Sequence, residues 1–232
     1  MFARVTLTAL AAGVIAGVFL WAAHMVLTTP LIQAAEVYES ASAHAAAPGH
    51  AASEHGQAAS EDDFRRHGLT LLMDVLTGVG FAFILSGLLS LTNLAVDWRN
   101  GLLWGLGGFA AFFIAPSLGL PPKLPGMETA SLDMRQVWWL ATAAATVAGL
   151  GLIFLSGTAV LRAAGVVLIV LPQVVGAPGM ESAFEPGGVP AELAARFVIA
   201  TTVATGLFWM VLGAFSGYFY NRFDQNRDYD NG

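Results

Sequence analysis

The sequence predicts an all-α fold, a polytopic membrane helix bundle with six transmembrane helices. Of the 232 residues, 56% are hydrophobic and only 11% are charged, and the mean hydropathy is +0.66. Because one soluble core cannot bury that much apolar surface, a soluble enzyme domain is excluded. We therefore expect a single integral membrane domain over residues 1–232, with no separate soluble domain.

Polar links separate the six expected spans. The first begins behind Arg4 and is too long for the apolar core of a signal peptide, so we expect it to be retained. The link at residues 97–100 allows only a tight turn, and three prolines exclude a helix from the connector after the third span. Gly-x-x-x-Gly spacings that begin at Gly13, Gly101 and Gly213 would let helix backbones pack closely. The expected spans are residues 5–28, 69–94, 101–118, 136–156, 161–175 and 197–220.

The stretch from residue 33 to 67 differs in composition from the spans. It is rich in Ala, Ser, Gly and His, carries several acidic residues and shows neither a helical nor a strand period. We expect an exposed loop, placed outside the cell with both termini in the cytoplasm, because long loops cross the membrane largely regardless of charge. Its histidines could collect metal weakly or have no function, since their spacing fits no rigid helical site. They are His44, His50, His55 and His67.

A short motif occurs twice between the later spans. Residues 125–130, Pro-Gly-Met-Glu-Thr-Ala, match residues 178–183, Pro-Gly-Met-Glu-Ser-Ala, at five of six positions. Each copy precedes a Leu-x-x-Arg-x-Val segment, whose Arg135 or Arg196 we expect to form an ion pair with an acidic residue. A Tyr-Glu-Ser-Ala segment after the first span is a weaker match, which chance also explains. The hypothesis is three related helical hairpins, each with one carboxylate on the same face: Glu39, Glu128 and Glu181.

Candidate metal ligands come from nitrogen and oxygen, because the chain contains no cysteine. An ionisable side chain inside a span is costly and points to function. His24, late in the first span, and Asp74, early in the second, fall near the same boundary of the membrane, where they could also be a merely solvated pair. Glu36 and Glu39 share a face if the first helix continues through them, and would complete an outer cation vestibule. The expected metal ligands are Glu36, Glu39, His24, Asp74, Glu128 and Glu181.

The charge distribution favours cations as partners and argues against nucleic acid. The formal net charge is −6, and eleven of the 16 acidic residues fall on the expected outer side. The sequence contains no nucleotide-binding loop, zinc-protease motif or serine-hydrolase motif. We therefore predict that the chain is not an enzyme and needs no cofactor. Energy for any transport would come from a gradient, from the membrane potential or from a separate protein.

Four runs of the sequence resemble the CbtA family, predicted cobalt-transporter subunits of bacterial cytoplasmic membranes. They lie at residues 29–39, 78–82, 108–126 and 135–139, and the resemblance covers nearly the whole chain except residues 42–64. Lys123 stands where the family often has an acidic residue, which argues against a metal role for the connector. The motif residues are Tyr38, Pro121, Pro122, Pro125, Gly126, Arg135, Gln136, Trp138 and Trp139.

The resemblance implies cobalt uptake for cobalamin synthesis, together with a small single-span membrane partner, CbtB, that carries histidines of its own. The residues themselves leave two functions open. One is a permease or permease subunit in the lipid bilayer for a divalent metal ion, cobalt or nickel. The other is a non-transporting membrane scaffold or assembly subunit whose outer loop binds a partner or weakly buffers metal. A shared polar cavity for His24, Asp74 and the repeat glutamates would favour the permease.

Overall fold

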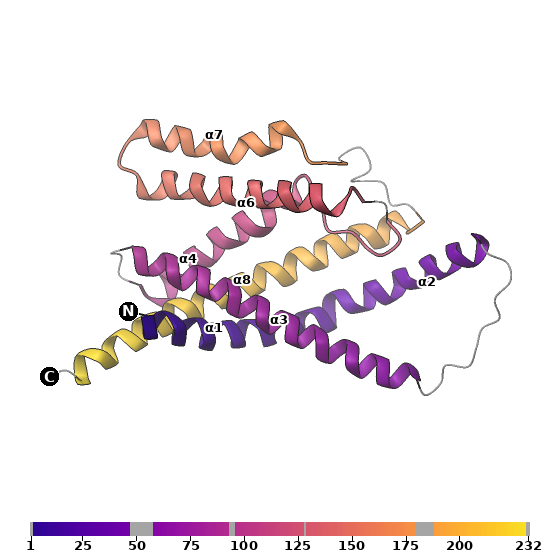
Figure 1. The fold of residues 1–232 in the computed structure, drawn as a ribbon, viewed down its shortest axis with the longest axis horizontal. Helices are drawn as coiled ribbons and strands as arrows, with labels where there is room; N and C mark the ends of the chain where they lie inside the picture. Colours follow the sequence, from indigo (N-terminus) through magenta and orange to yellow (C-terminus); the bar gives the residue numbers. More distant parts are fainter. Residues whose placement is uncertain (1, 47–57, 93–95, 128, 180–187, 231–232) are drawn as a thin grey trace. The chain divides into compact units, whose positions relative to one another are not determined.

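The regular elements are all helices in the part of the chain that the computed structural model describes, residues 2–46, 58–92, 96–127, 129–179 and 188–230 (Figure 1). The expected all-α class is therefore confirmed. The chain divides into two compact units. The first unit comprises Met1–Leu27, Ala43–Leu106 and Ala204–Gly232, and the second comprises Thr28–Ser42 and Gly107–Val203.

Helices lie in all six stretches where the sequence predicted a span. Within the described residues, four helical stretches are long and apolar enough to cross a membrane: Phe2–Tyr38, Phe64–Leu91, Leu132–Leu155 and Ala191–Asp224. The helices in the other two expected spans are shorter or interrupted, so length and composition support four of the six expected crossings. In chain order, the helices are α1 (Phe2–Ala23), the π-helix η1 (His24–Thr28), α2 (Thr29–Ala46), α3 (Ala58–Leu91), α4 (Trp98–Phe109), the π-helix η2 (Ala110–Ile114), α5 (Ala115–Ser117), α6 (Leu132–Leu155), α7 (Ala159–Val175) and α8 (Ala191–Asp230).

The prediction of an exposed loop over residues 33–67 is wrong for most of that length. Helix α2 continues to Ala46 and α3 begins at Ala58, while residues 47–57 lie outside the described part of the chain. Alanine has the highest helix propensity, and extending an existing helix needs no new nucleus. The alanine-rich composition therefore prolongs the first helix although no apolar period marks it.

Both π-helical segments in the described residues lie at the same distance before a proline. Segment η1 covers the positions six to two residues before Pro30, and η2 covers the same positions before Pro116. Proline has no amide hydrogen, and in an α-helix its ring clashes with the carbonyl four residues earlier. A π-turn widens the backbone at that carbonyl and lets the helix continue. The first span therefore runs through Pro30 instead of ending there.

In the first unit, α1 and α3 pack through glycines. A Cβ atom on Gly17 would lie 2.7 Å from the carbonyl oxygen of Asp74, and one on Gly13 would lie 2.7 Å from the amide nitrogen of Val79. Since the position earlier in α1 meets the position later in α3, the two helices are antiparallel. The missing side chains let the backbones touch, as small residues do in membrane helix pairs.

Close contacts between glycines also join α4 to α8 within the first unit. A Cβ atom on Gly101 would lie 3.0 Å from the amide nitrogen of Gly217, and one on Gly105 would lie 3.0 Å from the Cα atom of Gly213. The spacings at residues 13, 101 and 213 thus all serve helix packing, as the sequence predicted. At the end of α8, Asp224 forms an ion pair with Arg4 of α1.

The second unit contains the antiparallel pair α6 and α7 and the proline-rich connector. The two helices meet at Gly149 and Gly165, whose Cβ atoms would each lie 2.6 Å from the carbonyl oxygen of the other glycine. Gln173 of α7 donates a hydrogen bond of 2.8 Å to the carbonyl of Ala115. A small apolar core made by Ala35, Leu124 and Val189 anchors the connector.

The glycine contact between α1 and α3 predicts opposite effects for two neighbouring substitutions. Gly78→Ala places a methyl group 3.0 Å from the amide nitrogen of Gly17 and is expected to destabilise the protein by about 1–3 kcal/mol through overpacking. Gly80→Ala, two residues later in the same helix, meets no atom within 4 Å and is expected to leave stability unchanged or slightly higher. Thermal unfolding of the purified protein in detergent measures both; equal unfolding temperatures would contradict the packing.

Candidate functional site

The first candidate site is a histidine–aspartate pair inside the first unit. His24 is the first residue of η1, and its Nδ1 atom lies 3.0 Å from Oδ2 of Asp74 in α3. The Asp74 residue is buried, with only 8% of its surface exposed, and the His24 side chain is three-quarters buried. The close contact of Gly17 with the Asp74 backbone fixes the helix spacing at this level. The structure thus brings together two of the predicted metal ligands, His24 and Asp74.

This pair can exchange a proton or bind a cation. A buried carboxylate requires a partner that replaces its hydration, and an imidazole supplies one when it donates from Nδ1. The pair also offers one oxygen and one nitrogen ligand of the kind that Co²⁺ and Ni²⁺ accept. Over the described residues no group of three or more His, Asp or Glu side chains could hold a metal ion. The pair alone therefore leaves most of a cation's coordination shell to other ligands.

The remaining predicted ligands are dispersed. Glu36 of α2 is half-buried and belongs to the second unit, whereas His24 and Asp74 belong to the first. His67 of α3 is also half-buried. Glu39 and His44 lie in α2, but their side chains are outside the description, as are residues Glu128, Glu181, His50 and His55 altogether. The four-residue vestibule therefore stays a prediction.

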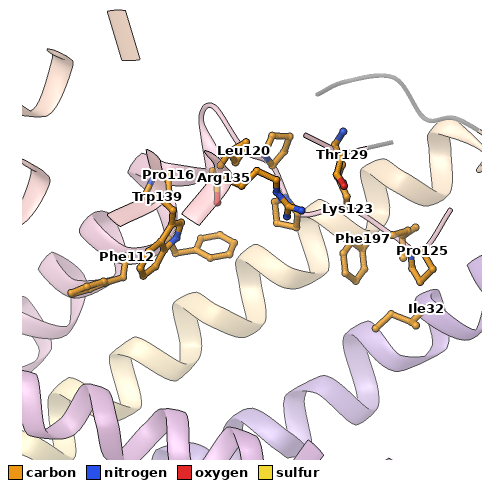
Figure 2. A pocket seen from close by; sticks show the side chains of 15 residues that line it. Ile32, Phe112, Pro116, Leu120, Lys123, Pro125, Thr129, Arg135, Trp139 and Phe197 are labelled. Carbon is orange, nitrogen blue, oxygen red and sulfur yellow. The ribbon is translucent and has the colours of Figure 1, made fainter. Parts of the chain in front are cut away.

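The second candidate site is a cavity of about 600 Å³ within the second unit (Figure 2). The proline-rich connector forms one side of it, and η2, α6, α8 and α2 contribute Phe112, Trp139, Phe197 and Ile32. Sequence reasoning singled out the connector and the Arg-Gln-x-Trp-Trp segment but did not predict that they enclose a common space. Five of the motif residues line the cavity: Pro121, Pro122, Pro125, Arg135 and Trp139.

Tight packing behind the cavity holds the connector in place. A Cβ atom on Gly119 would lie 2.6 Å from the Trp138 ring and 2.7 Å from the Cβ atom of Ala177. Gly126 has a φ of 81°, and the amide of Met127 donates to the carbonyl of Leu124 over 3.3 Å. Proline followed by a glycine of positive φ is the signature of a type II turn. The connector therefore has a defined shape, which gives the cavity a fixed wall.

Two cationic side chains are among the described residues that line the cavity. Its lining includes Lys123 and Arg135 and no acidic side chain among the described residues. Of the other motif residues, Trp138 is buried beneath Gly119, while Tyr38 and Gln136 are exposed.

The comparison with protein families covers nearly all of the chain. No curated protein and no solved structure matches it. A family model described as "Probable cobalt transporter subunit (CbtA)" matches residues 2–221. That range contains the His24–Asp74 pair and every residue that lines the cavity. The chain therefore belongs to the CbtA family of probable cobalt transporter subunits.

Proposed function

We propose that the chain is the membrane subunit of a cobalt uptake system and that Co²⁺ passes the His24–Asp74 pair. The observation that carries the proposal is the position of this pair, a buried carboxylate and an imidazole 3.0 Å apart in an apolar helical unit. Ionisable groups at such positions mark ion and proton pathways in membrane proteins. The family description, a cobalt transporter subunit, agrees with that role.

The chemistry of the pair suits a transient cation site. A divalent ion at the pair takes the imidazole nitrogen and the carboxylate oxygen as ligands, and water completes its shell. The membrane potential contributes about 2.3 kcal/mol per charge per 100 mV, so a divalent ion entering a negative cytoplasm gains about twice that. Because two protein ligands bind weakly, the ion can also leave. Such a site favours passage over storage.

The His24–Asp74 pair supplies only two of the ligands that a metal ion needs. We propose that a small, single-span, histidine-bearing protein of the CbtB type supplies additional nitrogen ligands. Glu36 and Glu39 at the outer end of the first helical stretch capture the ion, and cobalamin synthesis is the use of the imported cobalt. The family description as a subunit supports an assembly with at least one other chain.

The membrane topology that we propose is six crossings in the bacterial inner membrane, with both termini in the cytoplasm and three related hairpins. The ion pair between Arg4 and Asp224 supports it, since the start of the first span and the end of the last lie together. For the repeat, Gly126 and Gly179 occupy matching Pro-Gly positions and both have a positive φ. A Cβ atom on Gly179 would lie 2.9 Å from the Cβ atom of Ala130, so the two copies of the motif are neighbours.

Removing either member of the pair is expected to lower uptake of radioactive cobalt at least about tenfold, because each substitution removes a charged or coordinating atom. The variants are Asp74→Asn and His24→Gln, expressed together with the single-span partner, with nickel as competitor. Asp97→Asn is the control, because Asp97 lies in the same unit and caps Asn100 through a hydrogen bond of 2.7 Å that asparagine also accepts. Full uptake by both variants excludes the pair from the path, and no uptake by the parent chain favours the scaffold function.

The capture role of the outer carboxylates gives a different kinetic signature. In Glu36→Gln combined with Glu39→Gln, we expect a several-fold rise in the cobalt concentration for half-maximal uptake with little change in the maximal rate. The reason is that these groups raise the local cation concentration without completing the site. The same uptake assay over a range of cobalt concentrations measures this. Unchanged kinetics would move the capture role to Glu128 and Glu181, which Glu128→Gln with Glu181→Gln then tests.

The proposed topology can be tested by labelling, since the chain has no cysteine of its own. In intact cells whose outer membrane has been removed, an impermeant maleimide is expected to label Gly68→Cys and Ala191→Cys, both at exposed positions. Arg222→Cys, exposed near the end of α8, is expected to react only after the membrane is opened. Labelling of Arg222→Cys alone in closed cells would contradict the proposed orientation, and labelling of all three positions would contradict the crossing of α8.

A further inference from the structure

The cavity in the second unit has the charge of an anion site. Arg135 and Lys123 line it, while no acidic side chain among the described residues does (Figure 2). At the start of α6, the Ser131 side chain makes no capping hydrogen bond, so the first amides of this 24-residue helix add positive potential beside Arg135. Asp133 in the same turn is exposed and does not line the cavity. The two cationic side chains and the first amides of α6 favour a negative ligand.

A comparison between the two copies of the repeat explains why Arg135 is available. Arg196 holds the equivalent position in the second copy and forms a 2.7 Å ion pair with Glu192, four residues earlier on its helix. The residue four before Arg135 is Ser131, which provides no carboxylate. Among the described residues, Arg135 forms no side-chain ion pair. The expected ion pair is therefore confirmed for Arg196, whereas the structure shows none for Arg135 among the described residues.

Most of the other residues that line the cavity are apolar. They include the aromatic rings of Phe112, Phe113, Trp139 and Phe197 and the connector prolines. A small inorganic anion would use none of this surface. The connector also directly precedes α6, which is long and apolar enough to cross a membrane, and lipid headgroups and aromatic belts lie at the ends of such helices. The ligand should therefore carry both an anionic group and an apolar body.

We propose that this cavity binds an anionic phospholipid, with its phosphate on Arg135 and Lys123 and its glycerol and upper acyl carbons against the aromatic rings. A guanidinium donates two parallel hydrogen bonds to phosphate oxygens, which makes arginine a preferred phosphate ligand. Basic pockets between membrane helices bind lipid headgroups in the same manner. The site is separate from the cation pair, and the proposal does not depend on cobalt transport.

The test is lipid binding to the purified full-length protein in detergent, measured by native mass spectrometry. Phosphatidylglycerol is titrated against the parent chain, Arg135→Gln and Arg196→Gln. We expect Arg135→Gln to weaken binding about tenfold or more, because a charge-assisted bidentate contact is lost. Arg196→Gln, the matched control from the repeat, is expected to stay within about twofold of the parent. Equal weakening by both, or by neither, would overturn the site.

Competition experiments with three other ligands distinguish the possible sources of the phosphate. Diacylglycerol lacks the phosphate, glycerol 3-phosphate lacks the acyl chains, and phosphatidylcholine has no net charge. We expect each of them to compete at least about tenfold less well than phosphatidylglycerol. Equal competition by glycerol 3-phosphate would identify a soluble phosphate as the ligand. Equal competition by diacylglycerol would show that the anionic group does not contribute to binding. Either result rejects the proposal.

A conservative variant provides a test that does not depend on the folding of Arg135→Gln. Arg135→Lys keeps the charge but not the planar fork, so we expect a smaller, several-fold loss of affinity with an unchanged unfolding temperature. If Arg135→Gln does not yield folded protein, the comparison of Arg135→Lys with Arg196→Lys decides the matter. Identical affinities for those two variants would contradict the proposed phosphate contact.

Discussion

The backbone contact of α1 with α3 is the constraint on which the first unit depends. In a bilayer, lipid tails are as apolar as the side chains, so burial alone does not press two helices together. Gly13, Gly17 and Gly78 remove the side chains that would keep the backbones apart. The resulting spacing brings the Nδ1 atom of His24 within 3.0 Å of the Asp74 carboxylate. Close packing and polar pairing are thus two results of one contact.

The helices could be predicted from the sequence where a long apolar run stands alone, as in α6. They could not be predicted where two signals compete. Pro30 indicates a helix end, yet a π-turn at residues 24–28 lets the helix pass through it. The alanine-rich segment after residue 33 lacks an apolar period, yet its propensity keeps it helical. The rules for proline and for apolar periods treat each short segment separately, whereas the helical structure of these residues depends on the helix that precedes them.

The candidate sites also combine features that could be predicted from the sequence with features that could not. The proximity of His24 and Asp74 followed from two antiparallel spans, but their hydrogen-bond distance depends on a register that the glycine contact sets. The cavity around Arg135 could not be predicted, because it requires the connector to fold back beside the first turns of α6. The first unit buries a carboxylate with an imidazole, and the second gathers two cationic side chains against aromatic rings.

The coupling of proline to a π-turn also fixes the rotational phase of the first helical stretch. A π-turn accommodates about one residue more than an α-turn, and one residue corresponds to about 100° of rotation. The face that Glu36 presents is therefore offset from the one it would present in an uninterrupted α-helix that began at Phe2. Pro30 thus shifts by about one residue the set of positions that share a helical face, so the apolar pattern of α1 does not determine which face carries Glu36.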